Sequence, residues 1–392
     1  MHFCFLFNHD AEHQVRHTAP IISAMCKTYP EISITALASS DSQFKTVQQI
    51  VGRTHPQHLI LRKIATPAIF DSVLNCLNGI APIRRLYTLA RYRALFEQFD
   101  CLIVPEMTST LLKTLLGLSR TPLILLPHGA GDRTIGFTDE IKQFDFVLIS
   151  GTKVRDRMLA QHLIRQDNHC VVGYPKFDTI HNFKSETQKF FENNRPTILY
   201  NPHFDPRLSS WYDMGKDVLE FFASHNEFNL ICAPHVMLFK KWAHFSLESG
   251  VMRRPGRIAK KYLAYPNIKI DLGSDQCLNM AYTMSADVYL GDVSSQVYEF
   301  LRQPRPCIFL NSHRANWRGN QNYKFWNCGP VLSRVTDLTG ALDNLESAGD
   351  RYRDIQIRSF AETFHMTETP ASIRAADAIV SFMKSRPGFA TL

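Results

Sequence analysis

Short apolar runs rich in β-branched residues alternate along the chain with longer segments in which apolar residues recur at helical spacing. In the first half these runs cover residues 2–8, 32–38, 58–62, 101–105, 123–127, 146–150 and 170–173. In the second half they cover residues 197–201, 229–233, 267–271, 286–291 and 307–310. Strands that alternate with helices form βαβ units, so the pattern predicts an α/β fold with parallel sheets.

The alternation stops once, between residues 174 and 196, where the sequence is polar and bounded by prolines. We therefore predict two doubly wound parallel-sheet domains, over residues 1–185 and 186–350, that face a cleft. For residues 351–392 the sequence predicts two helices, which are separated at Thr369-Pro370 and pack back across the domains. Ligands of such sheets bind beyond the carboxyl ends of the strands, so residues at those ends are the candidates for a site.

The basic residues are concentrated in two segments. The chain carries 44 Lys and Arg against 36 Asp and Glu, a formal net charge of +8. Residues 83–94 hold four arginines and no acid, and residues 238–262 hold seven basic residues and one acid, so the rest is near neutral. Localised charge mixed with aromatic residues suits an anionic membrane surface or a phosphate-bearing acceptor better than general nucleic-acid binding.

The chain has nine cysteines, which is an odd number. They form no C-x-x-C pair and mostly lie in apolar runs. This usage predicts a reducing cytoplasm and argues against disulfides and zinc. No apolar run approaches the roughly 18 residues of a membrane helix. We therefore expect a cytoplasmic protein that lies, at most, on the inner face of the membrane.

Polar residues follow four of the predicted strands. In the first half, 123–127 leads into His128-Gly129, where the imidazole either transfers protons or caps the strand. In the second half, Asn201-Pro-His203, Pro234-His235 and the segment 291–295 (Gly-Asp-Val-Ser-Ser) each end a strand. The serines precede a predicted helix, so they either bind a phosphate or serve as an ordinary N-cap.

Several cofactor motifs are absent from the sequence. The first strand is not followed by G-x-G-x-x-G, and the chain has neither a P-loop nor H-E-x-x-H. We therefore expect no cofactor and no metal.

The order of His128-Gly129, Gly-Tyr-Pro-x-x-Asp at 173–178, Ile-Leu-Tyr-Asn-Pro at 198–202, His235 and Asp-x-Ser-Ser at 292–295 resembles a known family. It is similar to the CDP-glycerol glycerophosphotransferases, the teichoic-acid-type polymerases and primases that build phosphopolyol polymers on the cytoplasmic side of the membrane. The resemblance covers about residues 120–330. It implies a GT-B fold, with residues 1–185 on the acceptor side and residues 186–350 binding the nucleotide donor.

The resemblance also implies roles for individual residues. His128 is the general base on the acceptor hydroxyl, His235 lies beside the donor pyrophosphate, and both are predicted to be catalytic. The acceptor oxygen attacks the β-phosphorus of CDP-glycerol and CMP leaves. The further residues predicted to bind the donor or its phosphates are Gly129, Asn201, His203, Asp292, Ser294, Ser295 and Glu299. Residues predicted to contact the acceptor or the membrane are Arg133, Lys240, Lys241, Arg253 and Arg254.

Three positions depart from the family pattern. The chain has Pro234-His235 where the family usually has His-Pro, and Ala130-Gly131 where Thr-Pro usually follows His-Gly. It has Glu299 where an aspartate is common, and an acid at this place binds a ribose in sugar-nucleotide enzymes. The sequence therefore leaves open whether the donor is CDP-glycerol or another nucleotide-activated group.

The expected partners are this donor, a cell-surface glycan or lipid-linked acceptor, and an anionic membrane surface, but no nucleic acid. Two alternatives remain. The first is a UDP-sugar-using GT-B glycosyltransferase or an isomerase like UDP-N-acetylglucosamine 2-epimerase. The second is a non-catalytic GT-B scaffold.

Overall fold

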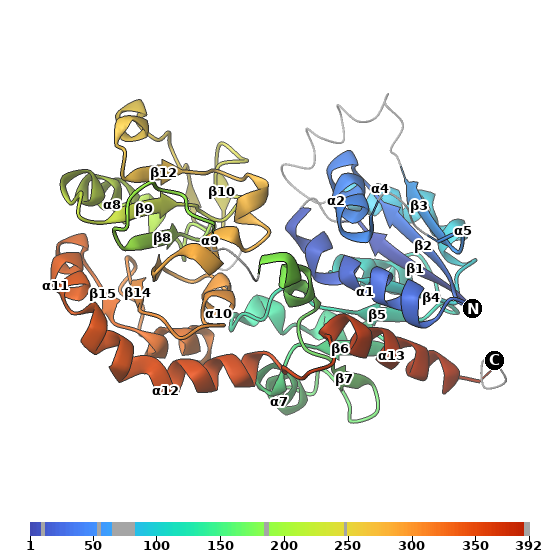
Figure 1. Cartoon of the computed structure of the whole chain (residues 1–392). Helices are drawn as coiled ribbons and strands as arrows, with labels where there is room; N and C mark the ends of the chain where they lie inside the picture. Colours follow the sequence, from blue (N-terminus) through green and yellow to red (C-terminus); the bar gives the residue numbers. More distant parts are fainter. Residues whose placement is uncertain (9–11, 53–55, 65–82, 184–187, 247–248, 388–392) are drawn as a thin grey trace. The chain divides into compact units, whose positions relative to one another are not determined.

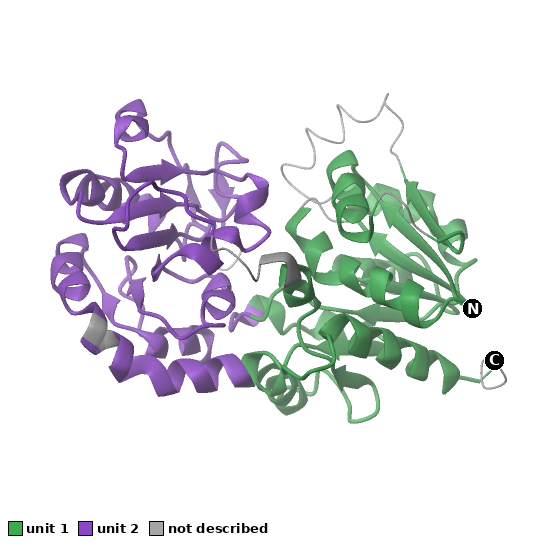
Figure 2. Cartoon of the chain, viewed as in Figure 1, with its two compact units in different colours: residues 1–130, 135–181, 362–392 green, residues 131–134, 182–361 purple. Residues whose placement is uncertain are grey.

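The computed structural model describes residues 1–8, 12–52, 56–64, 83–183, 188–246 and 249–387 (Figure 1). The chain divides into two compact units (Figure 2). Unit 1 comprises Met1–Ala130, Ile135–His181 and Glu362–Leu392, and unit 2 comprises Gly131–Thr134 and Asn182–Ala361. The domain ranges 1–185, 186–350 and 351–392 that we inferred from the sequence stay a prediction.

Unit 1 is built on a seven-stranded sheet in the order β3-β2-β1-β4-β5-β6-β7, in which all neighbouring strands are parallel. Its strands are β1 (His2–Phe7), β2 (Ser33–Ala38), β3 (Leu59–Lys63), β4 (Cys101–Val104), β5 (Leu123–Leu125), β6 (Phe146–Ile149) and β7 (His169–Val171). The interior strand β1 is buried on both sides, which explains why its sequence is apolar at nearly every position.

Successive side chains of β1 point to opposite faces of the sheet and enter two separate cores. Phe3, Phe5 and Phe7 lie in the first core, whereas Cys4 and Leu6 lie in the second. Helices α1 (Val15–Thr28), α2 (Asp41–Val51) and α13 (Ala371–Lys384) supply the first core. Helices α4 (Ile83–Arg91), α5 (Arg93–Phe96), α6 (Leu111–Thr114) and α7 (Thr152–Ala160) supply the second.

Unit 2 is built on a six-stranded parallel sheet in the order β12-β9-β8-β13-β14-β15. Its strands are β8 (Thr197–Asn201), β9 (Asn229–Cys232), β12 (Ile268–Ile270), β13 (Val288–Gly291), β14 (Cys307–Leu310) and β15 (Val331–Leu332). The α-helices are α8 (Trp211–Ser224), α9 (Ala281–Ser285), α10 (Gln296–Phe300), α11 (Leu338–Asp343) and α12 (Leu345–Thr363). The two-residue strands β10 (His244–Phe245) and β11 (Met252–Arg253) pair antiparallel as a separate hairpin.

All the strands expected from the sequence are present, with their ends shifted by at most a few residues. The prediction missed β10, β11 and β15, each of which has only two residues and so shows no periodicity. The split of the tail at Thr369-Pro370 is also found, since α12 ends at Thr363 and α13 begins at Ala371. Within the described residues, no helix combines the length and the apolar character needed to cross a bilayer.

Candidate active site

His128 lies in the turn that follows β5, as the sequence predicted. Gly129 has a φ of 76°, a backbone conformation that glycine adopts without strain. The His128 Nδ1 atom lies 3.0 Å from the carbonyl oxygen of Pro105. Because a carbonyl only accepts hydrogen bonds, Nδ1 carries the proton in the neutral ring. The Nε2 lone pair is then the group that receives a proton, and it lies 3.1 Å from the side-chain amide nitrogen of Gln14.

The surroundings of His128 favour the neutral ring. The protein packed around this partly solvent-facing imidazole lowers its pKa, and the positive charge of Arg85 lowers it further. The hydrogen bond to Pro105 acts in the opposite direction without reversing the shift. The lowered pKa keeps the ring neutral near pH 7, which is the protonation state that a general base requires.

The Gly-Tyr-Pro-x-x-Asp motif fixes the end of the chain within unit 1. Gly173 has a φ of 87°, and a Cβ atom there would lie 2.6 Å from the carbonyl oxygen of His365. Tyr174 packs in an aromatic cluster with Phe177 and Phe364. The Asp178 carboxylate accepts hydrogen bonds from the first two N–H groups of α13. The motif that carries much of the family resemblance is therefore architectural here.

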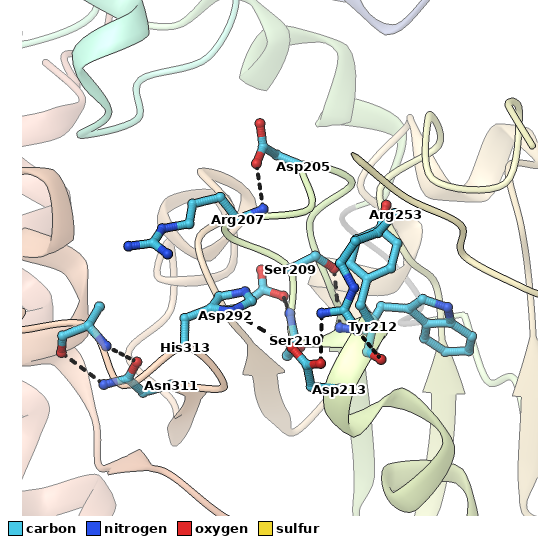
Figure 3. Close-up of polar contacts among 12 residues, drawn as sticks. Asp205, Arg207, Ser209, Ser210, Tyr212, Asp213, Arg253, Asp292, Asn311 and His313 are labelled. Carbon is cyan, nitrogen blue, oxygen red and sulfur yellow. Dashed lines mark hydrogen bonds and ion pairs between the residues drawn. The ribbon is translucent and has the colours of Figure 1, made fainter. Parts of the chain in front are cut away.

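In unit 2 the strands β9, β8, β13 and β14 are neighbours, so their carboxyl ends bring the predicted donor residues to one edge of the sheet. Asp292, directly after β13, is fully buried at the centre of this edge. Its carboxylate accepts hydrogen bonds from the N–H groups of His203 and Val293. It also accepts from both the N–H and the hydroxyl of Ser210 (Figure 3). Burial raises the pKa of Asp292 to about 6, against the effect of these donors.

Asn201 and Asp292 hold the strand ends in place. The Asn201 amide donates to the carbonyl of Ala233 at 2.7 Å and accepts from the Tyr289 hydroxyl at 3.3 Å. Gly291 leaves room for the Tyr289 ring, because a Cβ atom would lie 2.5 Å from it. Asn201 and Asp292 are buried and engaged, so any contribution they make to donor binding is through the position of their neighbours.

His203 and His235 end the adjacent strands β8 and β9, and their ring centroids lie 5.5 Å apart. The Nδ1 atom of His203 accepts the N–H of Asp205, and that of His235 accepts the N–H of Met237. An N–H group only donates, so each neutral ring carries its own proton on Nε2. Burial and the nearby charge of Arg133 lower the pKa of His203 to about 3.

Ser294 and Ser295 differ in accessibility. Ser294 is buried and accepts the N–H of Gln296 at 3.3 Å, whereas Ser295 is partly exposed and caps no N–H of α10. Helix α10 has only five residues, so its dipole is weaker than the sequence-based expectation assumed. Glu299 is buried within this helix.

The predicted acceptor and membrane contacts separate into three environments. Arg133 belongs to the short segment Gly131–Thr134 of unit 2 and acts electrostatically on His203. Arg253 is held by Asp213 at 2.7 Å and donates to the Tyr212 carbonyl, so it is a structural cation (Figure 3). Lys240, Lys241 and Arg254 are exposed around the β10–β11 hairpin.

No motif or pattern in the sequence pointed to three residues that lie near the candidate site. Gln14 in the 3-10 helix at Glu12–Gln14 meets His128 from 114 positions away, and Ser210 meets Asp292 from 82 positions away. His313, after β14, places its Nδ1 3.7 Å from Asp213. Each contact depends on the sheet order, which a periodicity argument does not provide.

Comparisons with known proteins bear on this geometry. Solved structures of the wall teichoic acid polymerase TagF align with a TM-score of 0.59 at 13% identity, covering 97% of this chain and 89% of that one. UDP-GlcNAc 2-epimerase from Neisseria meningitidis, bound to UDP-GlcNAc, aligns with a TM-score of 0.57 at 14% identity, covering 98% of this chain and all of that one. At such identities the likeness concerns the fold, and it confirms the predicted GT-B-like class of two parallel-sheet domains.

A search of curated protein sequences found no match. The family model for CDP-glycerol:poly(glycerophosphate) glycerophosphotransferase matches residues 116–381, about two thirds of the chain. This range includes every strand-end residue described above except Pro105, and it also leaves out Gln14. The chain therefore belongs to the CDP-glycerol:poly(glycerophosphate) glycerophosphotransferase family and is a transferase of that class.

Proposed function

We propose that this transferase moves glycerol phosphate from CDP-glycerol to a hydroxyl of a glycerol phosphate chain, with His128 as the general base. The observation that carries the proposal is the hydrogen bond between His128 Nδ1 and the Pro105 carbonyl. Because Nδ1 carries the proton in the neutral ring, Nε2 is the atom that takes the proton of the acceptor hydroxyl. The Gln14 amide donates to the same Nε2 atom, so the acceptor hydroxyl takes the place of this hydrogen bond when it binds.

The reaction balances without a further reactant. The acceptor oxygen attacks the β-phosphorus of CDP-glycerol as its proton passes to His128 Nε2. The bond between the β-phosphorus and the bridging oxygen breaks, and that oxygen leaves with its electron pair on CMP. Negative charge grows on the transferring phosphoryl group, where hydrogen-bond donors held in place before the reaction lower the barrier.

Unit 2 supplies hydrogen-bond donors of this kind at the proposed binding site for CDP-glycerol. His203 and His235 each carry an Nε2–H, because Nδ1 of each ring accepts a backbone N–H, and the partly exposed Ser295 adds a hydroxyl. Asp292 fixes the loop that bears His203. We assign His203, His235 and Ser295 to the donor phosphates, and Asn201, Asp292 and Ser294 to the positioning of these groups. Glu299 is proposed to bind the ribose and Gly129 to permit the turn at His128.

A panel of CDP-glycerol, CMP, UDP-N-acetylglucosamine and GDP-mannose tests the donor by thermal stabilisation, because a ligand of the folded state shifts unfolding by mass action. We expect CDP-glycerol and CMP to raise the unfolding temperature of the wild type. Ser295→Ala should reduce this shift, whereas Ser224→Ala, on the same unit away from the site, should preserve it. A preference for a UDP-sugar would refute the proposed donor and favour the glycosyltransferase or isomerase alternative.

The membrane surface is the second part of the proposal. We call residues 240–246 and 249–257, which include the β10–β11 hairpin, the basic finger. Trp242, Phe245 and Met252 in this segment are 70%, 57% and 61% exposed. Lys240, Lys241 and Arg254 stand among them, and Arg254 lies over the Trp242 ring. Exposed aromatic residues beside cations suit the interface of an anionic bilayer, where the rings enter the headgroup region and the cations meet lipid phosphates.

A further inference from the structure

A cavity of about 580 Å³ opens in unit 2 at a distance from the groups assigned to the donor. Its wall comes from the loop after β14, from the segment between Trp326 and Ser333, and from α12. The side chains that define its chemistry are Arg314, Trp317, Arg318, Asn327, Arg351 and Tyr352. The volume lies within the range of small-molecule sites.

All the charged side chains that line this cavity are positive. Three arginines contribute to its lining, and the lining includes no aspartate or glutamate. Within the part of the chain that the structure describes, none of the three guanidinium groups forms an ion pair with a carboxylate. Arg318 and Arg351 lie instead over the rings of the adjacent Trp317 and Tyr352. A cluster of cations without counter-charges favours an anionic ligand.

The loop that carries Arg314 is held in a defined shape. The Asn311 side chain accepts the N–H of Ala315 at 2.7 Å and donates to its carbonyl at 3.0 Å, which closes the loop (Figure 3). Arg314 has a φ of 51°, a left-handed conformation that costs energy for a residue with a side chain. His313 faces Asp213 on the other side of the same loop. These contacts fix the backbone that carries Arg314.

The position in the sheet separates this cavity from the proposed donor site. The donor residues follow β8, β9 and β13, whereas the cavity lies beyond β14 and β15. Adjacent strands are about 4.8 Å apart, so the cavity extends from one strand spacing beyond β13, at the loop after β14, to roughly 10 Å beyond it, at β15. Trp326 joins the two places, because its ring lines the cavity and its Nε1–H donates to the carbonyl of Asp292 at 2.6 Å. The cavity is therefore a second site within reach of the first.

We propose that this cavity binds phosphodiester groups of the glycerol phosphate chain that accepts the transferred unit. The inference rests on the proposed function, because it names where the acceptor polymer is held. Guanidinium groups offer planar pairs of N–H donors that match phosphate oxygens. Asn327 adds an amide for glycerol hydroxyls, and the aromatic rings shield the ion pairs from water. Several weak contacts along one polymer would hold its end near the transferase site.

A synthetic glycerol phosphate hexamer is the probe, measured by titration calorimetry and as the acceptor in turnover assays. We expect Arg318→Ala and Arg351→Ala each to weaken hexamer binding by about tenfold, since each removes a charge-assisted contact. The KM for the hexamer should rise while kcat changes little. Arg353→Ala, an exposed arginine on the same helix as Arg351, should bind the hexamer like the wild type.

Binding of CDP-glycerol separates the two proposals. If the wild type binds and uses CDP-glycerol, but the variants bind the hexamer normally, the cavity assignment is wrong and the proposed function stands. If Arg318→Ala and Arg351→Ala lose CDP-glycerol or CMP affinity as strongly as hexamer affinity, the cavity belongs to the donor and the inference also fails. If the wild type does not bind the hexamer at all, neither the site nor this acceptor is correct.

Discussion

Asp178 shows how a single residue of the Gly-Tyr-Pro-x-x-Asp motif stabilises the fold. Asp178 belongs to the short 3-10 helix at Pro175–Phe183, yet it receives the N–H groups of Ala371 and Ser372 at the start of α13. Pro370 precedes that helix and its side chain cannot cap it. The carboxylate therefore acts as a cap from a distant part of the sequence, at the positive end of the helix.

Replacing Asp178 by alanine should destabilise unit 1 by about 1 kcal/mol, within the range measured for lost N-cap side chains. Urea unfolding checks this as a lower transition midpoint with an unchanged slope. Asp156→Ala, which removes an exposed carboxylate of α7, is the matched control and should leave the midpoint near that of the wild type. Equal midpoints for the two variants would show that Asp178 is not needed as a cap.

Replacing His128 by alanine should lower kcat by about 10²- to 10⁴-fold, the usual contribution of a general base. CDP-glycerol binding should survive, because the donor residues belong to unit 2. In the wild type the lowered pKa of His128 should place the acid limb of the rate profile below the usual histidine value of about 6.5. Turnover and calorimetry test both parts, with His169→Ala in the same unit as control. Normal turnover by His128→Ala would eliminate this residue as the base.

At the level of elements, the positions of the longer strands could be predicted because buried parallel strands appear in the sequence as apolar runs. The runs at 197–201 and 307–310 coincide with β8 and β14, and Pro370 marks the gap between the last two helices. The position of the candidate residues at the strand ends could be predicted for the same reason. The sequence did not show that Asp132 would accept hydrogen bonds from Tyr298 and Phe325, since such distant contacts leave no local pattern.

The basic finger is the element for which a surface role can be tested directly. Trp242→Ser and Phe245→Ser should each weaken binding to phosphatidylserine-containing vesicles by tenfold or more, because each withdraws a large exposed ring from the interface. Sedimentation with vesicles measures the effect. Leu115→Ser changes a comparably exposed apolar residue of unit 1 and should bind normally. Equal loss for all three variants would point to general hydrophobic adhesion instead of the finger.

Across the part of the chain that the structure describes, the surrounding protein favours the neutral form of several histidines. The pKa is lowered, with desolvation as the largest cause, for His2, His17, His128, His203, His244 and His313. Such a histidine binds a proton more readily in the unfolded chain than in the folded protein. The folded state therefore loses stability as the pH falls below about 6.5, the pKa in the unfolded chain. Asp292 and Glu106 act in the opposite sense, because burial raises the pKa of both carboxyls.

Six histidines outweigh two carboxyls, so the free energy of unfolding should decrease steadily between pH 7 and pH 5. His203, whose pKa is lowered to about 3, supplies up to about 1.4 kcal/mol per pH unit of this slope over the window from about 6.5 downward. His203→Gln should flatten the slope by that amount, whereas His365→Gln, at an exposed position, should not. Urea unfolding at several pH values gives both slopes. A wild-type stability that rises on acidification would mean that the buried carboxyls, and not the histidines, dominate the proton balance.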